Sequence, residues 1–223
     1  MPDTDRGART YRSELRQRQA AETRRRVVES AIEEFGERGY HGATFARIAK
    51  RAGVSVETVR ANGPKAALLW AAVAVASFGV EGDIEFFDTE RGKNMLELRE
   101  PDAFGAYLGE TMLAINEPVA GVWTAVTAAA HGDCEVRDTL AERLVSMRRQ
   151  VEKVLQVVGE RDWLRTDVPF DDLVEALCVI TSVEAYVRYV RTDGKPREEY
   201  QAFVARTVND TILRRSSGDA PLS

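Results

Sequence analysis

The stretch over residues 44–65, TFARIAKRAGVSVETVRANGPK, constrains the fold more than any other part of this sequence. Thr44 can cap a helix whose apolar residues then recur with helical spacing, at Phe45, Ile48, Ala49 and Ala52. Gly53 follows where a tight turn needs a residue that tolerates positive φ, and Ser55 can cap a second helix. The second helix of such a corner can enter a DNA major groove. An ordinary helical hairpin in an all-α core would show the same spacing.

The charge distribution is asymmetric along the chain. Residues 1–65 hold 14 Lys or Arg and 9 Asp or Glu, a net charge of +5, within a chain whose total is −5. The remaining residues therefore carry −10. A basic head on an acidic body indicates that a polyanion contacts the head alone, although a charged cluster is more commonly a solvated face.

Composition indicates a globular protein and argues against several other classes. No apolar run approaches the roughly 18 residues of a membrane span, and the Arg-rich N-terminus is unlike a secretory signal. The two cysteines, Cys134 and Cys178, lack the short spacing of a zinc site. We therefore expect a cytoplasmic protein with reduced cysteines, no metal, no cofactor and no membrane partner.

Hydrophobic periodicity predicts an all-α protein of about nine helices. We expect a flexible basic arm over 1–22, a helix-turn-helix DNA-binding domain over 23–66, a helical ligand-binding and dimerisation domain over 67–215, and a flexible tail over 216–223. The expected helices cover 23–37, the two of the corner, 64–80, 102–116, 118–130, 134–158, 170–191 and 197–215, with an irregular segment over 81–101. The arm could contact phosphates or simply aid solubility.

A family resemblance emerges from residues 23–59, TRRRVVESAIEEFGERGYHGATFARIAKRAGVSVETV. This segment resembles the N-terminal domain of the tetracycline-repressor (TetR) family of bacterial transcription regulators. Residues 64–69, PKAALL, are similar to the start of that family's fourth helix. The resemblance implies a homodimeric, ligand-responsive DNA-binding transcription regulator, and we expect a repressor. The sequence shows no catalytic constellation, glycine-rich phosphate loop or clustered metal ligands, so we do not expect an enzyme.

One part of the corner departs from the family pattern. Family members usually continue the third helix with an aromatic pair, Tyr-x-x-Phe, whereas this chain has RANGP over residues 60–64. In the family, that tyrosine commonly contacts a phosphate and the phenylalanine packs the corner. Arg60 could replace the phosphate contact, because a guanidinium binds phosphate well. No residue of the sequence obviously replaces the packing of the phenylalanine. Whether residues 60–64 retain the usual DNA contacts therefore stays open.

DNA contacts are expected from the two helix starts and the altered corner. The candidates are Thr44, Ser55, Val56, Glu57, Thr58, Arg60 and Lys65. Among them, Glu57 can accept a hydrogen bond from cytosine and Arg60 can bind guanine, while Thr44 and Lys65 suit phosphates. In a dimer, two recognition helices would enter successive major grooves about 34–36 Å apart on a pseudo-palindrome.

Residues 170–191 are apolar around most of the helix circumference, so this helix needs cover on two sides. A second subunit can supply one side, as the last two helices do in the family. The dimer candidates are Leu177, Ile180, Glu184, Val187, Val204, Val208 and Ile212.

A small-molecule effector is expected among the helices of the body. The candidate pocket residues are Tyr107, Met112, Trp123, Thr127, Met147 and Val151. Each is also suited to an ordinary core position. Two alternatives stay open: a ligand-binding or adaptor protein with degenerate DNA recognition, and an all-α enzyme, which would need converging ionisable groups in the body.

Overall fold

The computed structural model describes the backbone of residues 4–214 and the side chains of residues 15–214. Within that range the protein is all-α, as the sequence predicts, with one isolated β-bridge between Leu164 and Leu213. The predicted tail over 216–223 lies outside the described residues. The elements are α1 Thr4–Gly42, α2 Phe45–Ala52, α3 Val56–Ala61, α4 Lys65–Phe78, the 3-10 helix η1 Phe86–Asp88, α5 Glu90–Leu96, α6 Pro101–Ala130, α7 Cys134–Glu160, α8 Phe170–Thr181, α9 Val183–Tyr186, the π-helix η2 Val187–Thr192 and α10 Arg197–Thr211.

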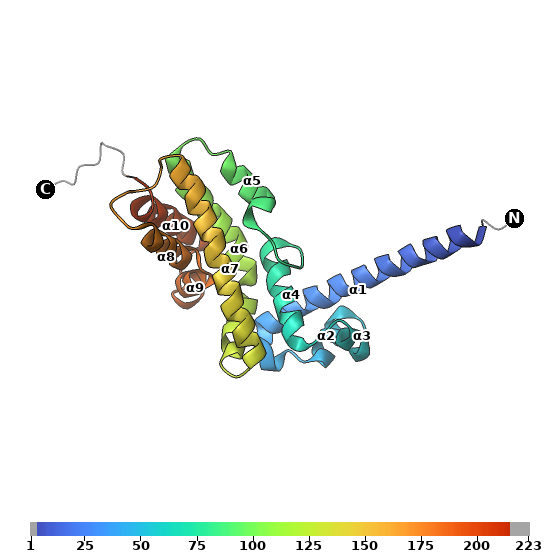
Figure 1. Ribbon diagram of the computed structural model, residues 1–223. Helices are drawn as coiled ribbons and strands as arrows, with labels where there is room; N and C mark the ends of the chain where they lie inside the picture. The colour runs from blue at the N-terminus through green and yellow to red at the C-terminus, as the bar shows by residue number, and fades with distance from the viewer. Residues whose placement is uncertain (1–3, 215–223) are drawn as a thin grey trace.

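The head consists of α1, α2 and α3, and α1 is longer than the sequence predicts. It begins at Thr4 and extends away from the rest of the molecule, over residues where the sequence predicts a flexible basic arm (Figure 1). Few apolar residues lie there, but Arg, Gln, Glu and Ala have high helix propensity. Gly39 has φ 67°, a left-handed conformation, and interrupts the helix where the sequence predicts its end, yet one more turn follows to Gly42.

Two predicted helix boundaries in the body are wrong. Residues 101–130 form one helix, α6, with Pro118 inside it. Pro118 is exposed, so water can bind the carbonyl that the missing N–H leaves free, and the helix continues. Conversely, the predicted helix over 170–191 is divided at Ser182, whose ψ of 152° ends α8 and whose side chain caps α9 by accepting from the Ala185 N–H.

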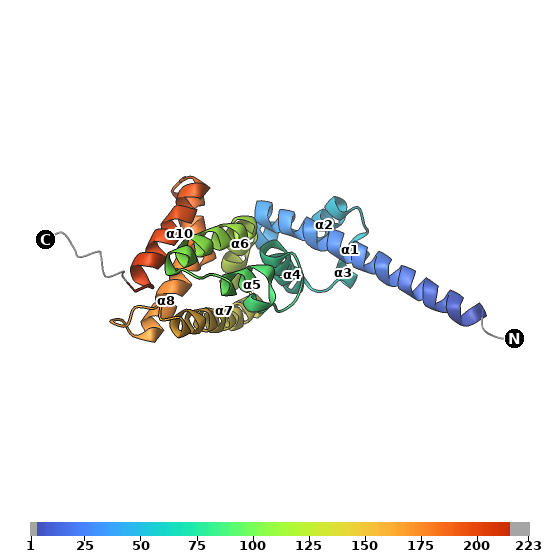
Figure 2. The same ribbon diagram turned by 90° about the horizontal axis from the view of Figure 1, so that it is seen from above.

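Helix α6 is the centre of the body. It packs against α1, α4, α7 and α10, and Figure 2 shows it lying between α7 and α10. Gly105 and Gly109 allow α10 to approach closely, because a Cβ on Gly109 would lie 2.5 Å from the Gln201 carbonyl oxygen. Helices α8 and α10 end up together at the side of the body that lies opposite the free end of α1 (Figures 1 and 2).

Candidate nucleic-acid interface and internal cavity

The two short helices of the head begin with the side-chain caps that the sequence predicts. The Thr44 hydroxyl oxygen accepts from the Arg47 N–H at 3.3 Å, and the Ser55 hydroxyl oxygen accepts from the Thr58 N–H at 3.0 Å. Gly53 has φ 66° between them. Ile48 and Val59 are fully buried, so α2 and α3 pack on the head core with their other faces outward. This is a helix-turn-helix, and α3 occupies the place that a recognition helix has in such a motif.

The candidate DNA contacts divide into exposed and half-buried side chains. Thr44, Ser55, Glu57 and Arg60 are exposed. Val56 is half-buried and packs against the core, and the Thr58 hydroxyl lies 3.0 Å from that of Ser55. The start of α3 therefore presents mainly Glu57 and Arg60 to solvent.

The basic side chains of the head fall into two groups. Arg51 is occupied by the carboxylates of Glu33, Glu34 and Glu37 on α1, so it joins α2 to α1. Within residues 15–214, by contrast, no acidic side chain pairs with Arg47, Lys50 or Arg60. The candidates predicted from the sequence do not include Arg47 and Lys50. Both are cations on the helix that Thr44 caps, three and six residues after the cap, and this pattern indicates candidate phosphate contacts.

The altered corner over residues 60–64 is held by hydrogen bonds instead of aromatic packing. The Asn62 amide donates to the Thr58 carbonyl at 2.7 Å, and the Arg24 guanidinium donates to the Asn62 carbonyl at 2.6 Å. Gly63 takes φ 119° and leads into α4. Arg24 on α1 thus stabilises a corner that the sequence alone leaves without a visible support.

Lys65 and Tyr40 connect the head to the body. The Lys65 ammonium lies 4.7 Å from the centroid of the Tyr40 ring, and its partial burial lowers its pKa. The Tyr40 hydroxyl donates to the Asp133 carboxylate at 3.0 Å, and Asp133 in turn caps α7. Burial, together with this carboxylate, raises the pKa of Tyr40 to about 12.

A cavity of about 550 Å³ lies in the body, where α4, α6, α7 and α8 surround it. Its lining is mainly aliphatic, aromatic and methionine side chains, and it includes four of the six candidate pocket residues, Met112, Trp123, Met147 and Val151. The structure places the other two elsewhere. The Tyr107 hydroxyl donates to the Arg91 carbonyl at 2.7 Å, and Thr127 lines a smaller hollow beside Glu184 and Arg188.

The charged groups at the cavity are already paired within the protein. Arg24 binds Glu81 at 2.7 Å, Arg143 binds Asp83, and Arg148 binds Glu175 at 2.6 Å. The Trp123 indole N–H donates to Glu184 at 2.7 Å. Across the described residues, no group of three or more His, Cys, Asp or Glu side chains is arranged to hold a metal ion.

Most candidate dimer residues are buried inside the single chain. Leu177, Ile180, Val204, Val208 and Ile212 are at most 9% exposed, because α8 packs against α7 and α10, and α10 packs against α6. Glu184 is exposed and Val187 half-buried. The outward face of α8 carries Val179, which is 61% exposed. Helical periodicity identified the apolar faces but could not tell which of them faces its own core.

Fold and site together define a helix-turn-helix domain joined by α4 to a helical body that contains a cavity. Residues 27–59 match the family model described as "Bacterial regulatory proteins, tetR family". Comparison with curated protein sequences gives no significant match.

Solved structures extend the similarity to the body. A transcriptional regulator from Saccharomonospora viridis in complex with choline superposes with a TM-score of 0.69 at 19% identity, over 87% of this chain and 100% of that chain. A TetR-family regulator from Mesorhizobium loti gives 0.66 at 16% identity, over 86% and 95%. The fatty acid degradation regulator FadR from Bacillus halodurans gives 0.64 at 19% identity, over 83% and 92%.

Residues 27–59 therefore match the helix-turn-helix domain of the tetR family, and the chain as a whole has the fold of these solved regulators. No helix in the described part of the chain is long and apolar enough to cross a membrane.

Proposed function

We propose that this regulator is a homodimeric repressor that leaves a pseudo-palindromic operator when a small molecule occupies the cavity. The observation that carries the proposal is the double role of α4. Its first residue, Lys65, contacts Tyr40 in the head, while Ala67, Trp70, Ala74 and Phe78 farther along α4 line the cavity. A ligand that favours one position of α4 would thereby change the position of the head.

The effector is a largely apolar molecule. The lining residues are mostly hydrophobic, and the arginines at its edge already bind carboxylates, so an effector need not bring a charge to neutralise them. The choline bound in the S. viridis regulator supports a small-molecule site in this fold. We propose that shape and a few hydrogen bonds select the effector here.

The second subunit would cover the outward side of α8 and α10. Val179 on α8 is exposed, and Phe203 on α10, half-buried, stacks on Tyr189 with their ring centroids 5.0 Å apart. An exposed valine on α8, together with half-buried aromatic rings on α10 and η2, suits an interface between two copies of the chain.

The test starts from DNA selection. Operator fragments selected from random duplexes should be pseudo-palindromic, and their retardation by the protein should weaken steeply with salt. Equal affinity for selected and random duplexes at every salt concentration would refute sequence-specific regulation.

The ligand part is tested by a cavity-blocking variant in a thermal-shift screen of small apolar molecules. Val151→Trp places a large ring in the cavity, and Val145→Trp places the same ring on the exposed side of the same helix. A compound that stabilises wild type and Val145→Trp but not Val151→Trp, and that releases the operator, would support the proposal. Compounds that release the operator equally from all three proteins would contradict it.

A further inference from the structure

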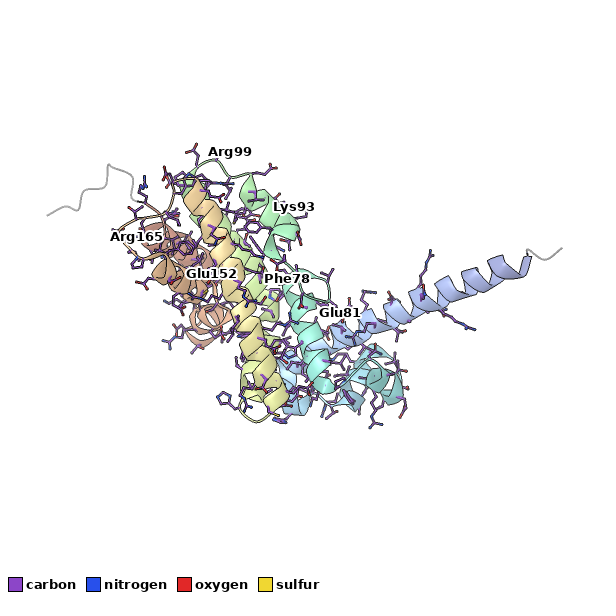
Figure 3. All side chains as sticks on the ribbon, in the orientation of Figure 1. Phe78, Glu81, Lys93, Arg99, Glu152 and Arg165 are labelled. Carbon is purple, nitrogen blue, oxygen red and sulfur yellow. The ribbon has the colours of Figure 1, made fainter. Side chains whose placement is uncertain are left out.

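Arg24 on α1 joins two segments that are distant in the sequence. Its Nη1 donates to the Asn62 carbonyl at 2.6 Å, while its Nε and Nη2 donate to the Glu81 carboxylate at 3.0 and 2.7 Å. Asn62 directly follows the recognition helix, and Glu81 lies three residues beyond Phe78, the last residue of α4 (Figure 3). The planar guanidinium can hold both partners at once because its donors point in fixed, different directions.

The Asn62 contact acts on a helix that has little other support at this end. Helix α3 has six residues, and only Val59 among them is buried. Its carboxyl end is fixed by the Asn62 amide from within the corner and by Arg24 from α1. The hydrogen bond that Arg24 donates therefore contributes to the position of the end of α3 that carries Arg60.

The Glu81 contact belongs to a segment that borders the cavity. We call residues 79–88 the cover segment, because Glu81, Gly82, Ile84 and Phe86 all line the cavity.

The opposite side of the cover segment is fixed to α7. Gln150 donates to the Ile84 carbonyl at 3.0 Å and accepts from the Phe86 N–H at 2.8 Å, and Arg143 binds Asp83. The cover segment thus bridges α7, on the cavity side, and Arg24, on the head side.

We propose that Arg24 is a positioning residue for the recognition helix, and that Glu81 makes its hold on Asn62 depend on the cover segment. This inference rests on the proposed function, since it describes how the same cavity acts on DNA binding. A ligand that displaces the cover segment moves Glu81, and Arg24 moves with its carboxylate partner. The Asn62 carbonyl then loses its charged donor, and α3 loses its fixed orientation.

Arg24→Gln and Arg25→Gln form a matched pair for the first half of the proposal. Both remove one positive charge from adjacent positions of α1, but among the described side chains Arg25 binds only Glu22 and Glu29 on its own helix. We expect Arg24→Gln to weaken operator binding by about tenfold or more, the range of a lost charged hydrogen bond. Its affinity for a random duplex should match that of Arg25→Gln, because the loss concerns orientation and not charge.

Hydrogen–deuterium exchange tests the second half without a known effector. Operator binding should slow amide exchange in peptides covering residues 81–88 in wild type and Arg25→Gln, because an oriented α3 fixes Arg24 and hence Glu81. The slowing should be lost in Arg24→Gln and in Glu81→Gln. If Arg24→Gln fails to fold by circular dichroism, Arg24→Lys replaces it, because a single ammonium keeps the charge but not the fork of donors.

The outcomes separate this inference from the proposed function. A wild type that does not distinguish operator from random duplex would remove the regulator itself. A wild type that does, together with an Arg24→Gln protein that binds operator as Arg25→Gln does, would overturn the role of Arg24 alone. Operator-induced slowing that persists in Glu81→Gln, or that is absent from wild type, would overturn the coupling to the cover segment.

Discussion

Replacing Asn116 should expose how the helix break at Ser182 is stabilised. Asn116 on α6 is 2% exposed, and its amide Nδ2 lies 3.1 Å from the Thr181 carbonyl oxygen, 3.3 Å from that of Ser182 and 3.0 Å from the Tyr200 hydroxyl. The Ser182 carbonyl also accepts from the Tyr186 N–H at 3.4 Å. In the described part of the chain, Asn116 is the only donor to the Thr181 carbonyl, which the end of α8 leaves without a helical partner.

Asn116→Leu keeps the number of side-chain heavy atoms and the branch at Cγ but removes the donor. The part-buried Thr181 carbonyl loses its hydrogen bond, the Ser182 carbonyl keeps only the 3.4 Å bond from the Tyr186 N–H, and the buried Tyr200 hydroxyl loses its donor. We therefore expect the free energy of unfolding to fall by about 2 kcal/mol. For a chain of this size, that loss corresponds to a decrease in Tm of roughly 4–8 °C. Tyr200→Phe is the control: it removes one of three acceptors and leaves both carbonyls bound, so it should cost about 1 kcal/mol or less.

Urea unfolding followed by far-ultraviolet circular dichroism measures both values. All proteins are compared at one concentration, because the stability of a dimer depends on it. If Asn116→Leu is as stable as wild type, or if Tyr200→Phe costs as much as Asn116→Leu, the assignment of the amide to the Thr181 carbonyl is refuted.

Three further predictions concern the dimer, the DNA contacts and acid stability. Val179→Asp should shift sedimentation equilibrium toward monomers, whereas Val145→Asp, at a position 52% exposed on α7, should not; equal dimerisation of both variants would place the interface elsewhere. Arg47→Ala should weaken binding to operator and random duplex alike, and it should reduce the slope of log affinity against log salt concentration by about 1. Glu57→Ala should instead change the preferred base, and identical effects of the two variants would contradict this division of roles. The Val136 N–H and the Tyr40 hydroxyl lower the pKa of Asp133, so its stabilisation is present above its ordinary pKa and is lost as the pH falls through the lowered value. Acidification from about pH 6 to about pH 3 should therefore destabilise wild type and the control Asp138→Asn more than Asp133→Asn in thermal melts, and an equal loss in all three would remove Asp133 as a cause.

The amino-acid sequence by itself determined the fold class, the helix-turn-helix and most of the helix positions. These features depend on local chemistry. Thr44 and Ser55 can cap helices without any distant partner, and Gly53 can adopt positive φ. Apolar residues that recur four positions apart show which segments form amphipathic helices. Residues 81–101, where the sequence predicts an irregular segment, contain only the short helices η1 and α5 before α6 begins, and Thr89 caps α5 by a similarly local contact.

Only the tertiary structure decided which partner each side chain meets. The continuity of α6 through Pro118 depends on that residue facing solvent, and the break at Ser182 depends on Asn116, which lies 65 residues from Thr181. Four of the six candidate pocket residues line the cavity, but Tyr107 points to α5, because a position on a helix fixes a direction and not the neighbour found there. Periodicity likewise could not show that Val208 packs inward while Val179 remains exposed. The link from Asn62 through Arg24 to Glu81 spans 57 residues from Arg24 to Glu81, and no local pattern records such a contact.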